Sequence, residues 1–414
     1  MHCVREVTDD LFWIGANDHK LHLFEAIHPI PQGVSYNSYV LLDESTVLFD
    51  TVDWSVCRQM MENLEYVLDG RGLDYVVVNH VEPDHCASLE FVLQAYPDCQ
   101  IVSTEKGFML MRQFGFAVDS HQQHEVHEGD TFSFGSHTVT FLEAPMVHWP
   151  EPMVTLDLTN GALFSADAFG SFIANDGRLW NDDVDYDRDY IDENRRYFTN
   201  IVGRYGPHVQ LLLGKAATVL DKIKLICPLH GLIWRNDFGY ILDKYDHWST
   251  YTPEEQGVQI VYGSMYGNTE SAAECLANEI CKRGVTNVVM HDVAETHASY
   301  LVADTFRLSH LVIACPTYNL NIYPPMHDFL DELRMLNMQN RTVAIVENGS
   351  WACESGDLIQ RFVEDEMKDM TVLNERLSIA SALHEDGRKE FEALADAIVE
   401  SVGKACTDCA SRFA

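Results

Sequence analysis

Four side chains that can bind a metal lie within six positions of this sequence, and few folds can accommodate such a group. His80, Glu82, Asp84 and His85 occur in "NHVEPDHCAS" (79–88), directly after an apolar strand. Holding their charges together without a cation would be costly. In an extended loop, positions i, i+2 and i+4 face the same way, so His80, Glu82 and Asp84 are expected to converge. A turn after Asp84 would then bring His85 in from the side.

Three more candidate ligands, His148, Asp167 and His230, also lie at the ends of expected strands. Each of them alone is typical of an ordinary histidine or a turn residue, but together with the four-residue cluster they make four imidazoles and three carboxylates. Such a set is sufficient for two metals that share one bridging carboxylate. Because it contains no thiolate and is rich in carboxylate, it favours iron or manganese over a structural zinc.

The apolar pattern divides the chain into two parts. Short strands alternate with loops over roughly the first 250 residues, and they are expected at 46–50, 75–79, 138–144, 161–167 and 224–230. A polar stretch at 249–257 reads as a linker. The boundaries predicted from this pattern are a metal domain at 1–250, a linker at 251–257, a second domain at 258–405 and a tail at 406–414.

The second part predicts an α/β fold with a doubly wound parallel sheet. Continuous apolar strands are expected at 258–263, 310–315 and 342–347, and a helix is expected at 269–284. The helix would bury one face and end at a glycine C-cap. The residues that define this face and cap are Ala272, Ala273, Leu276, Ile280 and Gly284.

The loop "GSMYGNTE" (263–270) lies between a strand and a helix and can cradle a phosphate. It has no lysine, so it is not a Walker A loop, and the chain has no G-x-G-x-x-G motif for a nicotinamide. The segments 315–326 and 347–352 follow later strands and reach the same sheet edge, where Trp351 could stack on a flat ring. The predicted cofactor-binding residues are Ser264, Met265, Tyr266, Gly267, Asn268, Thr269, Pro316, Thr317, Tyr318, Asn319, Asn348, Gly349, Ser350 and Trp351.

"HVEPDH", "HWP" (148–150), "SADAFG" (165–170) and "PLHG" (228–231) resemble the metallo-β-lactamase-like domain of flavodiiron proteins, an αβ/βα sandwich. Hydrolases of that superfamily carry histidine at the second ligand position, where this chain has Glu82. The resemblance implies that His80, Glu82 and His148 bind one iron. It implies that Asp84, His85 and His230 bind the other and that Asp167 bridges them.

The C-terminal half resembles the flavodoxin-like domain of the same family, which binds FMN. The resemblance implies reduction of O2 to water, of NO to N2O, or both, with electrons passing from an external donor through FMN to the di-iron site. The donor would be rubredoxin, a flavoprotein reductase or reduced coenzyme F420. It also implies a head-to-tail homodimer or a dimer of dimers.

Two other functions remain open from the sequence: a metallo-hydrolase with an appended flavodoxin module, and an electron carrier with a vestigial metal site. Cys406 and Cys409 form one Cys-x-x-Cys pair, whereas a rubredoxin iron site needs two, so surface thiols are favoured. His28 and Tyr197 match regions near the di-iron pocket in the family and could donate a hydrogen bond or a proton to bound substrate, but a packing role is favoured for each. Phe198 stands where relatives often have a second tyrosine.

The composition excludes several classes of partner. With 64 acidic residues against 28 Lys and Arg, the formal net charge is −36, so the surface repels phosphate backbones and anionic lipids. The 11 cysteines show no framework spacing, which is typical of reduced thiols in a cytosol. No signal peptide or membrane span is expected, and we therefore predict a cytoplasmic protein.

Overall fold

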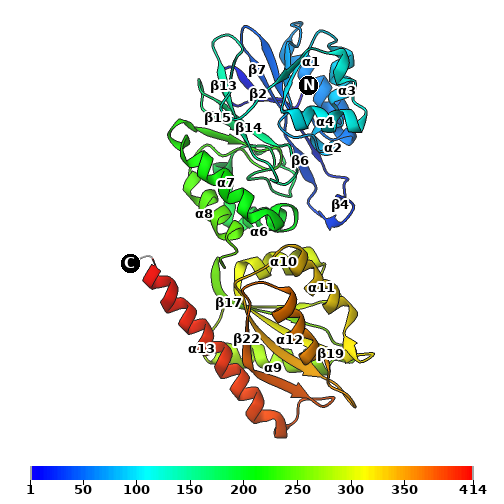
Figure 1. Cartoon of the computed structure of the whole chain (residues 1–414), viewed down its shortest axis with the longest axis vertical. Helices are drawn as coiled ribbons and strands as arrows, with labels where there is room; N and C mark the ends of the chain where they lie inside the picture. Colours follow the sequence, from blue (N-terminus) through cyan, green and yellow to red (C-terminus); the bar gives the residue numbers. More distant parts are fainter. Residues whose placement is uncertain (1, 413–414) are drawn as a thin grey trace. The chain divides into compact units, whose positions relative to one another are not determined.

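The computed structural model describes residues 2–412, and it describes side chains as far as residue 404. The side chains of Cys406 and Cys409 therefore lie outside the described residues. The chain forms two compact units, Met1–Asp246 and His247–Ala414, and each is described by itself (Figure 1).

The N-terminal unit is built on two sheets that pack face to face. The first has the strand order β1-β2-β7-β8-β9-β10-β11, and the second has the order β12-β13-β14-β15-β16. Strands of the first sheet are β1 (Arg5–Glu6), β2 (Leu11–Trp13), β7 (Tyr39–Leu42), β8 (Thr46–Phe49), β9 (Tyr75–Val77), β10 (Gln100–Ser103) and β11 (Gln123–Glu125). Strands of the second are β12 (Thr131–Ser133), β13 (Thr138–Glu143), β14 (Met153–Asp157), β15 (Ala162–Phe164) and β16 (Leu225–Cys227).

Helices cover the outer faces of these sheets, and two short ribbons, β3 with β6 and β4 with β5, lie beside them (Figure 1). The ribbon strands are β3 (Ala16–Asp18), β4 (Leu23–Phe24), β5 (His28–Pro29) and β6 (Val34–Tyr36). The helices are α1 (Cys57–Leu68), α2 (Pro83–Cys86), α3 (Leu89–Ala95), α4 (Glu105–Phe114), α5 (Tyr186–Asp189), α6 (Ile191–Tyr197), α7 (Gly206–Ala217) and α8 (Phe238–Ser249).

The core of this unit lies between the two sheets. Phe49 of β8 and Phe164 of β15 stack with ring centroids 3.8 Å apart, and both are fully buried. Burying one such ring contributes about 1.5–3 kcal/mol. Because β8 is also covered by helices on its other side, its whole sequence "TVLF" is apolar or buried, as the pattern predicted.

The C-terminal unit contains a parallel sheet with the strand order β18-β17-β19-β21-β22. Its elements are β17 (Glu255–Tyr262), α9 (Asn268–Lys282), β18 (Val288–Asp292), α10 (Ala298–Arg307), β19 (Leu308–Tyr318), β20 (Asn321–Ile322), α11 (Pro324–Met335), β21 (Thr342–Asn348), α12 (Ser355–Glu366), β22 (Thr371–Ile379) and α13 (Arg388–Arg412). Helices α9 and α13 share one apolar cluster with the sheet, whereas α10 and α11 contact each other outside that cluster. The sheet is therefore doubly wound, and the predicted α/β fold is confirmed.

Two boundaries differ from the expected pattern. Strand β17 begins at Glu255, so the last residues of the stretch 251–257 are already extended rather than linker. Helix α13 continues to Arg412, so residues 406–412 are helical where a tail was expected. Among the described residues, no helix is both long enough and apolar enough to cross a membrane.

Strand ends gather the candidate ligands at one edge of the sandwich. Strands β15 and β16 are parallel, with Phe164 opposite Cys227, so the loops that follow them leave the sheet side by side. Those loops carry Asp167 and His230. Strand β9 ends at Val77, immediately before the four-residue cluster.

Candidate metal centre and cofactor pocket

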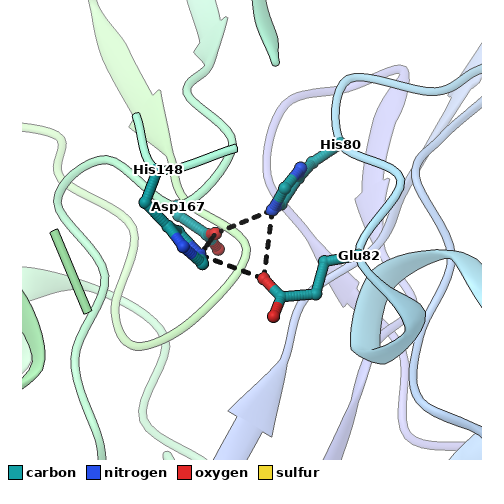
Figure 2. Close-up of side chains that lie close together, drawn as sticks. All are labelled: His80, Glu82, His148 and Asp167. Carbon is teal, nitrogen blue, oxygen red and sulfur yellow. Dashed lines mark hydrogen bonds and ion pairs between the residues drawn. The ribbon is translucent and has the colours of Figure 1, made fainter. Parts of the chain in front are cut away.

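The first group of side chains comes from three segments far apart in the sequence (Figure 2). It contains His80, Glu82, His148 and Asp167, whose ligand atoms all lie within 4.8 Å of one another, and all four residues are largely buried. His80 Nε2 lies 3.2 Å from Glu82 Oε2 and 3.1 Å from Asp167 Oδ2. His148 Nε2 lies 3.0 Å and 3.2 Å from the same two oxygens. Two imidazoles and two carboxylates thus converge on one point.

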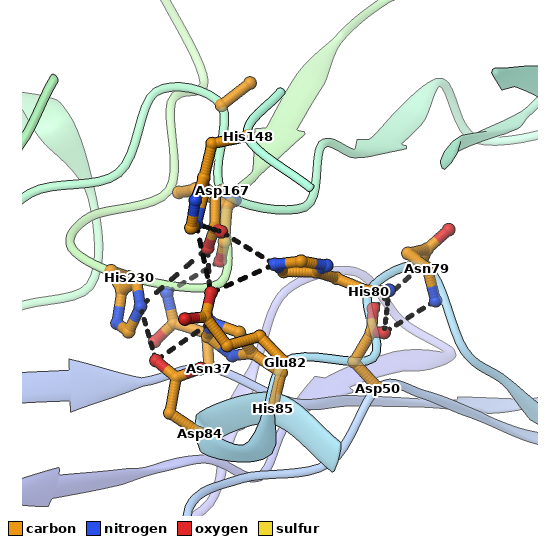
Figure 3. Close-up of polar contacts among 12 residues, drawn as sticks. Asn37, Asp50, Asn79, His80, Glu82, Asp84, His85, His148, Asp167 and His230 are labelled. Atoms are coloured by element: carbon orange, nitrogen blue, oxygen red, sulfur yellow. Dashed lines mark hydrogen bonds and ion pairs between the residues drawn. The ribbon is translucent and has the colours of Figure 1, made fainter. Parts of the chain in front are cut away.

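The second group lies beside the first (Figure 3). It contains Asp84, His85 and His230, again within 4.8 Å of one another. Both imidazoles approach the same carboxylate oxygen, since His85 Nε2 and His230 Nε2 each lie 3.2 Å from Asp84 Oδ2.

Asp167 connects the two groups. Its Oδ2 faces the first group, while its Oδ1 lies 3.1 Å from His85 Nε2 and 3.8 Å from His230 Nε2. A carboxylate with one oxygen toward each of two ligand sets has the arrangement of a bridging ligand.

The donor set fits a pair of metal ions. Ligands about 2.1 Å from an octahedral ion lie about 3 Å from one another, and the nitrogen–oxygen distances in both groups are close to that value. Several buried nitrogen and oxygen atoms that could ligate a metal lack a hydrogen-bond partner. Burying such atoms is costly unless a cation satisfies them. These atoms are Asp84 Oδ1 and Oδ2, His85 Nδ1 and Nε2, His148 Nε2, Asp167 Oδ1 and Oδ2, and His230 Nε2.

Electrostatics point the same way. Burial disfavours the charged form of Asp167, yet the imidazoles of His80 and His85 hold its pKa well below the usual range. Burial likewise opposes protonation of His148, but its contacts with Asp167 and Glu82 raise its pKa to about 10. Without a metal, these carboxylates favour the protonated form of His148. A divalent cation would supply that positive charge instead.

Other residues hold the ligands in place. Asp50 Oδ1 accepts hydrogen bonds from the backbone N–H groups of Asn79 and His80, at 2.7 and 3.2 Å. Ser35 accepts a 2.7 Å bond from His230 Nδ1 through its carbonyl oxygen, which turns Nε2 of that ring toward Asp84. Asn37 donates to the carbonyl oxygens of Pro228 and Gly231 and so fixes the loop around His230.

The structure corrects one local expectation. His80, Glu82 and Asp84 do not converge, because the extended segment ends at Glu82 and Pro83 begins helix α2. Pro at a first helical position is favoured, since its missing N–H has no partner there in any case. Asp84 therefore faces the second group with His85. This division agrees with the family resemblance rather than with the i, i+2, i+4 argument.

The hairpin of β4 and β5 brings a residue to the site that sequence reasoning missed. Glu25 lies in its turn, with φ of 50°, and its side chain is 34% exposed. Partial burial and the Glu82 carboxylate raise the pKa of Glu25 to about 7. A lone acid in a loop carries no sequence signal. His28, which was singled out, lies 4.0 Å from Glu25 through Nε2 and Oε2.

The side chains of Tyr197 and Phe198 have different ring contacts. The buried ring of Tyr197 lies 5.4 Å from that of His230, next to the metal ligands. Phe198 packs on Tyr245 with centroids 4.9 Å apart. Tyr197 therefore borders the ligand set, whereas the described ring contact of Phe198 is with Tyr245.

The second predicted site forms one cavity of about 430 Å³ in the C-terminal unit. Every predicted cofactor-binding residue except Gly267 lines it, and Gly267, with φ of 88°, precedes the first turn of α9. Leu320, Ala352 and Ser381 also line the cavity, although sequence reasoning did not select them.

This cavity suits a flat ring with a phosphate. It opens at the N-terminus of α9, where backbone N–H groups and the helix dipole favour an anion. Tyr266, Tyr318 and Trp351 supply aromatic surface around it, and Trp351 is 93% exposed. Its volume lies within the range of small-molecule sites.

Two family descriptions match this chain. "ODP family beta lactamase" matches residues 34–231, and "Flavodoxin" matches residues 260–390. The flavodoxin match implies FMN for the C-terminal cavity.

Whole-chain relatives combine both parts. An anaerobic nitric oxide reductase flavorubredoxin of Pectobacterium carotovorum is 30% identical over 366 residues, which cover 87% of this chain and 71% of the relative. The structure of rubredoxin oxygen:oxidoreductase from Desulfovibrio gigas is 26% identical, with a TM-score of 0.89 and coverage of 97% and 99%. The flavodiiron protein of Giardia intestinalis, 24% identical, shares the fold with a TM-score of 0.87 and coverage of 97% and 98%. This chain therefore belongs to the flavodiiron protein family.

Proposed function

We propose that this protein is an oxidoreductase that reduces O2 to water, NO to N2O, or both, with electrons that pass through FMN to a di-iron site. Its relatives include a nitric oxide reductase flavorubredoxin and a rubredoxin oxygen:oxidoreductase. The observation that carries the proposal is the position of Asp167 between two ligand groups, one of which contains Glu82.

The chain's own residues would prepare the site for this chemistry. Two irons held by the seven side chains would supply electrons to a small diatomic gas and stabilise the negative charge that develops on it. His80, Glu82 and His148 would hold one ion, Asp84, His85 and His230 the other, and Asp167 both. None of these side chains needs to act as a nucleophile. The rings of Phe24 and Tyr197 pack beside His230 and would restrict bulk water around an ion held there.

FMN would supply electrons one at a time from the cavity of the C-terminal unit. Ser264, Asn268 and Thr269 would face its phosphate, while Trp351 and Tyr318 would cover its ring. Ser264 Oγ already accepts a bond from Gly267 N–H at 3.1 Å, which holds the loop in a turn before α9.

Exposed apolar side chains indicate where a second copy of the chain would bind. Leu23 and Ile27, 45% and 57% exposed, lie on the β4–β5 hairpin beside the metal ligands, and Tyr266, Leu320 and Trp351 are 89%, 66% and 93% exposed around the FMN cavity. Such patches favour a partner surface. A head-to-tail homodimer, or a dimer of dimers, would cover both patches and bring one subunit's FMN to the other's irons.

An external donor is also required, and rubredoxin, a flavoprotein reductase and reduced F420 remain the candidates. The described cysteines are free, which supports a reducing compartment such as the cytoplasm.

The hydrolase alternative is not favoured. Its second ligand position would carry histidine, whereas Glu82 occupies that position and contacts His148. Two relatives that match both halves of the chain are named as a nitric oxide reductase flavorubredoxin and a rubredoxin oxygen:oxidoreductase.

The test is anaerobic reduction of the purified protein followed by separate pulses of O2 and NO. We expect rapid reoxidation of FMN by at least one gas, with water or N2O as product. Peroxide as the sole product from O2, together with no reaction with NO, would contradict the proposal. Two zinc ions per chain together with hydrolysis of a thioester or phosphodiester would instead support the hydrolase.

A further inference from the structure

We propose that Glu151 is a positioning residue that holds His80 and the adjoining backbone in the geometry required for metal binding. The inference rests on the proposed di-iron function. Glu151 Oε1 accepts a 2.7 Å hydrogen bond from His80 Nδ1 and a 2.9 Å bond from the backbone N–H of Val81. One carboxylate oxygen thus holds both the ring of a ligand and the chain between His80 and Glu82.

This contact is fully buried. The side chains of His80 and Glu151 are 0% and 1% exposed, so the bond is formed in a low dielectric and is strengthened by the charge on the acceptor. With its proton on Nδ1, His80 would keep the lone pair of Nε2 available for a metal on the side of Glu82 and Asp167. A carboxylate behind an imidazole also makes that imidazole a better metal ligand.

The imidazole rings of the two ligand groups differ in the groups that accept a hydrogen bond from Nδ1. His230 donates its Nδ1–H to the neutral carbonyl of Ser35, and His85 Nδ1 has no hydrogen-bond partner among the described residues. Among the described residues, a buried carboxylate thus accepts from Nδ1 of His80, but not from Nδ1 of His85 or His230. We expect the ion held by His80 to depend on Glu151 more than the ion held by Asp84 and His230.

One carboxylate oxygen of Glu151 makes no hydrogen bond. Its Oε2 is buried without a hydrogen-bond partner, and the residue borders a cavity of about 120 Å³ that is also lined by Thr104, Lys106 and His127. Thr104 Oγ1 donates to the backbone oxygen of Glu151 at 3.2 Å. Because that bond involves the main chain, replacing the side chain leaves it intact and removes only the contacts with His80 and Val81.

Glu151→Ala and Glu151→Gln test this role by iron titration against a competing chelator. We expect Glu151→Ala to weaken binding of one of the two irons by about 10- to 100-fold. Glu151→Gln should weaken it less, because an amide oxygen still accepts both bonds without the charge. FMN content should stay unchanged in both variants.

A matched control is Asp157→Asn. Asp157 forms a buried carboxylate–imidazole pair of the same kind with His137, 2.6 Å long, away from the metal ligands. This control should lower thermal stability without changing the affinity for iron. It separates loss of a buried pair in general from loss of metal positioning.

Wild-type iron affinity in Glu151→Ala would overturn the inference. So would a loss of iron affinity in Glu151→Ala that is no larger than the loss in Asp157→Asn. If Glu151→Ala does not fold, the iron affinity of Glu151→Gln tests the inference. A wild-type iron affinity in Glu151→Gln would then overturn it. Failure of the wild-type protein itself to bind two irons would refute the proposed function instead.

Discussion

At the scale of single residues, Asp167 determines whether the two ligand groups act as one site. Both of its oxygens face ligands, Oδ2 toward His80 and His148 and Oδ1 toward His85. An amide in its place presents one oxygen and one NH2 group, and the NH2 group cannot ligate a cation.

Asp167→Asn should therefore reduce iron content from two to about one per chain and lower gas reduction at least about 10-fold. FMN content should not change, since the FMN cavity contains no residue of the N-terminal unit. Iron analysis and gas consumption on the same preparation measure both effects. Two tightly bound irons in the variant would show that Asp167 does not bridge.

His137 provides a pH-dependent contribution to stability away from the metals. Its Nδ1 donates to Asp157 and its Nε2 to Asp10, at 2.6 and 2.8 Å. Burial alone would lower the pKa of His137, but the bonds to these carboxylates raise it above its usual 6.5. The charged form is thus favoured in the folded state. Its stabilisation is complete below about pH 6.5 and is lost as pH rises through the folded pKa.

His137→Asn should lower the free energy of unfolding by about 1.5–3 kcal/mol near pH 6. The difference from the wild type should shrink as the pH is raised toward 9, because the wild-type imidazole then becomes neutral. Urea unfolding at several pH values measures this. A difference that grows with pH would contradict the assignment.

The two groups of candidate ligands could be predicted because each residue follows an apolar strand and four of them lie within six positions. Asp50, Glu25 and Glu151 could not, because an isolated acid has no sequence pattern. Asp50 contacts Asn79 and His80 only after β8 and β9 pair side by side. Tertiary structure thus creates their roles.

At the scale of elements, continuous apolar runs predicted the strands well, whereas the structure of polar segments was predicted wrongly. Residues 255–257 were expected in a linker, yet they belong to β17, where Glu255 pairs with Leu308 of β19. The turn into α2 was missed because a single helical turn leaves no hydrophobic period. The i, i+2, i+4 argument failed for the same reason.

Gly267 is the element-scale test of the FMN site. It adopts φ of 88° before α9, and an added Cβ would meet no atom within 4 Å, so the cost of a side chain is conformational. Gly267→Ala should cost about 1–2 kcal/mol and weaken FMN binding by about 5- to 30-fold. Gly267→Asn should do less harm, because asparagine tolerates this conformation. Fluorescence titration with FMN compares them, and equal affinity in all three proteins would contradict the assigned loop role.

At the scale of the whole molecule, the exposed apolar patches in the two units lead to the proposed dimer. Ile27→Glu places a charge on the β4–β5 hairpin, where the native side chain is 57% exposed. It should shift the protein toward monomer and lower turnover about 10-fold or more, while iron and FMN contents stay at wild-type values. Light scattering and gas-consumption assays at the same concentration measure this. A monomer with full turnover would refute the dimer.

The proposed gas reduction depends on two irons held between the seven side chains. Anomalous X-ray scattering from crystals, recorded on both sides of the iron absorption edge, locates them directly. We expect one peak among His80, Glu82 and His148, a second among Asp84, His85 and His230, and Asp167 between the two. A single peak, a zinc signal in place of iron, or peaks away from these residues would contradict the account.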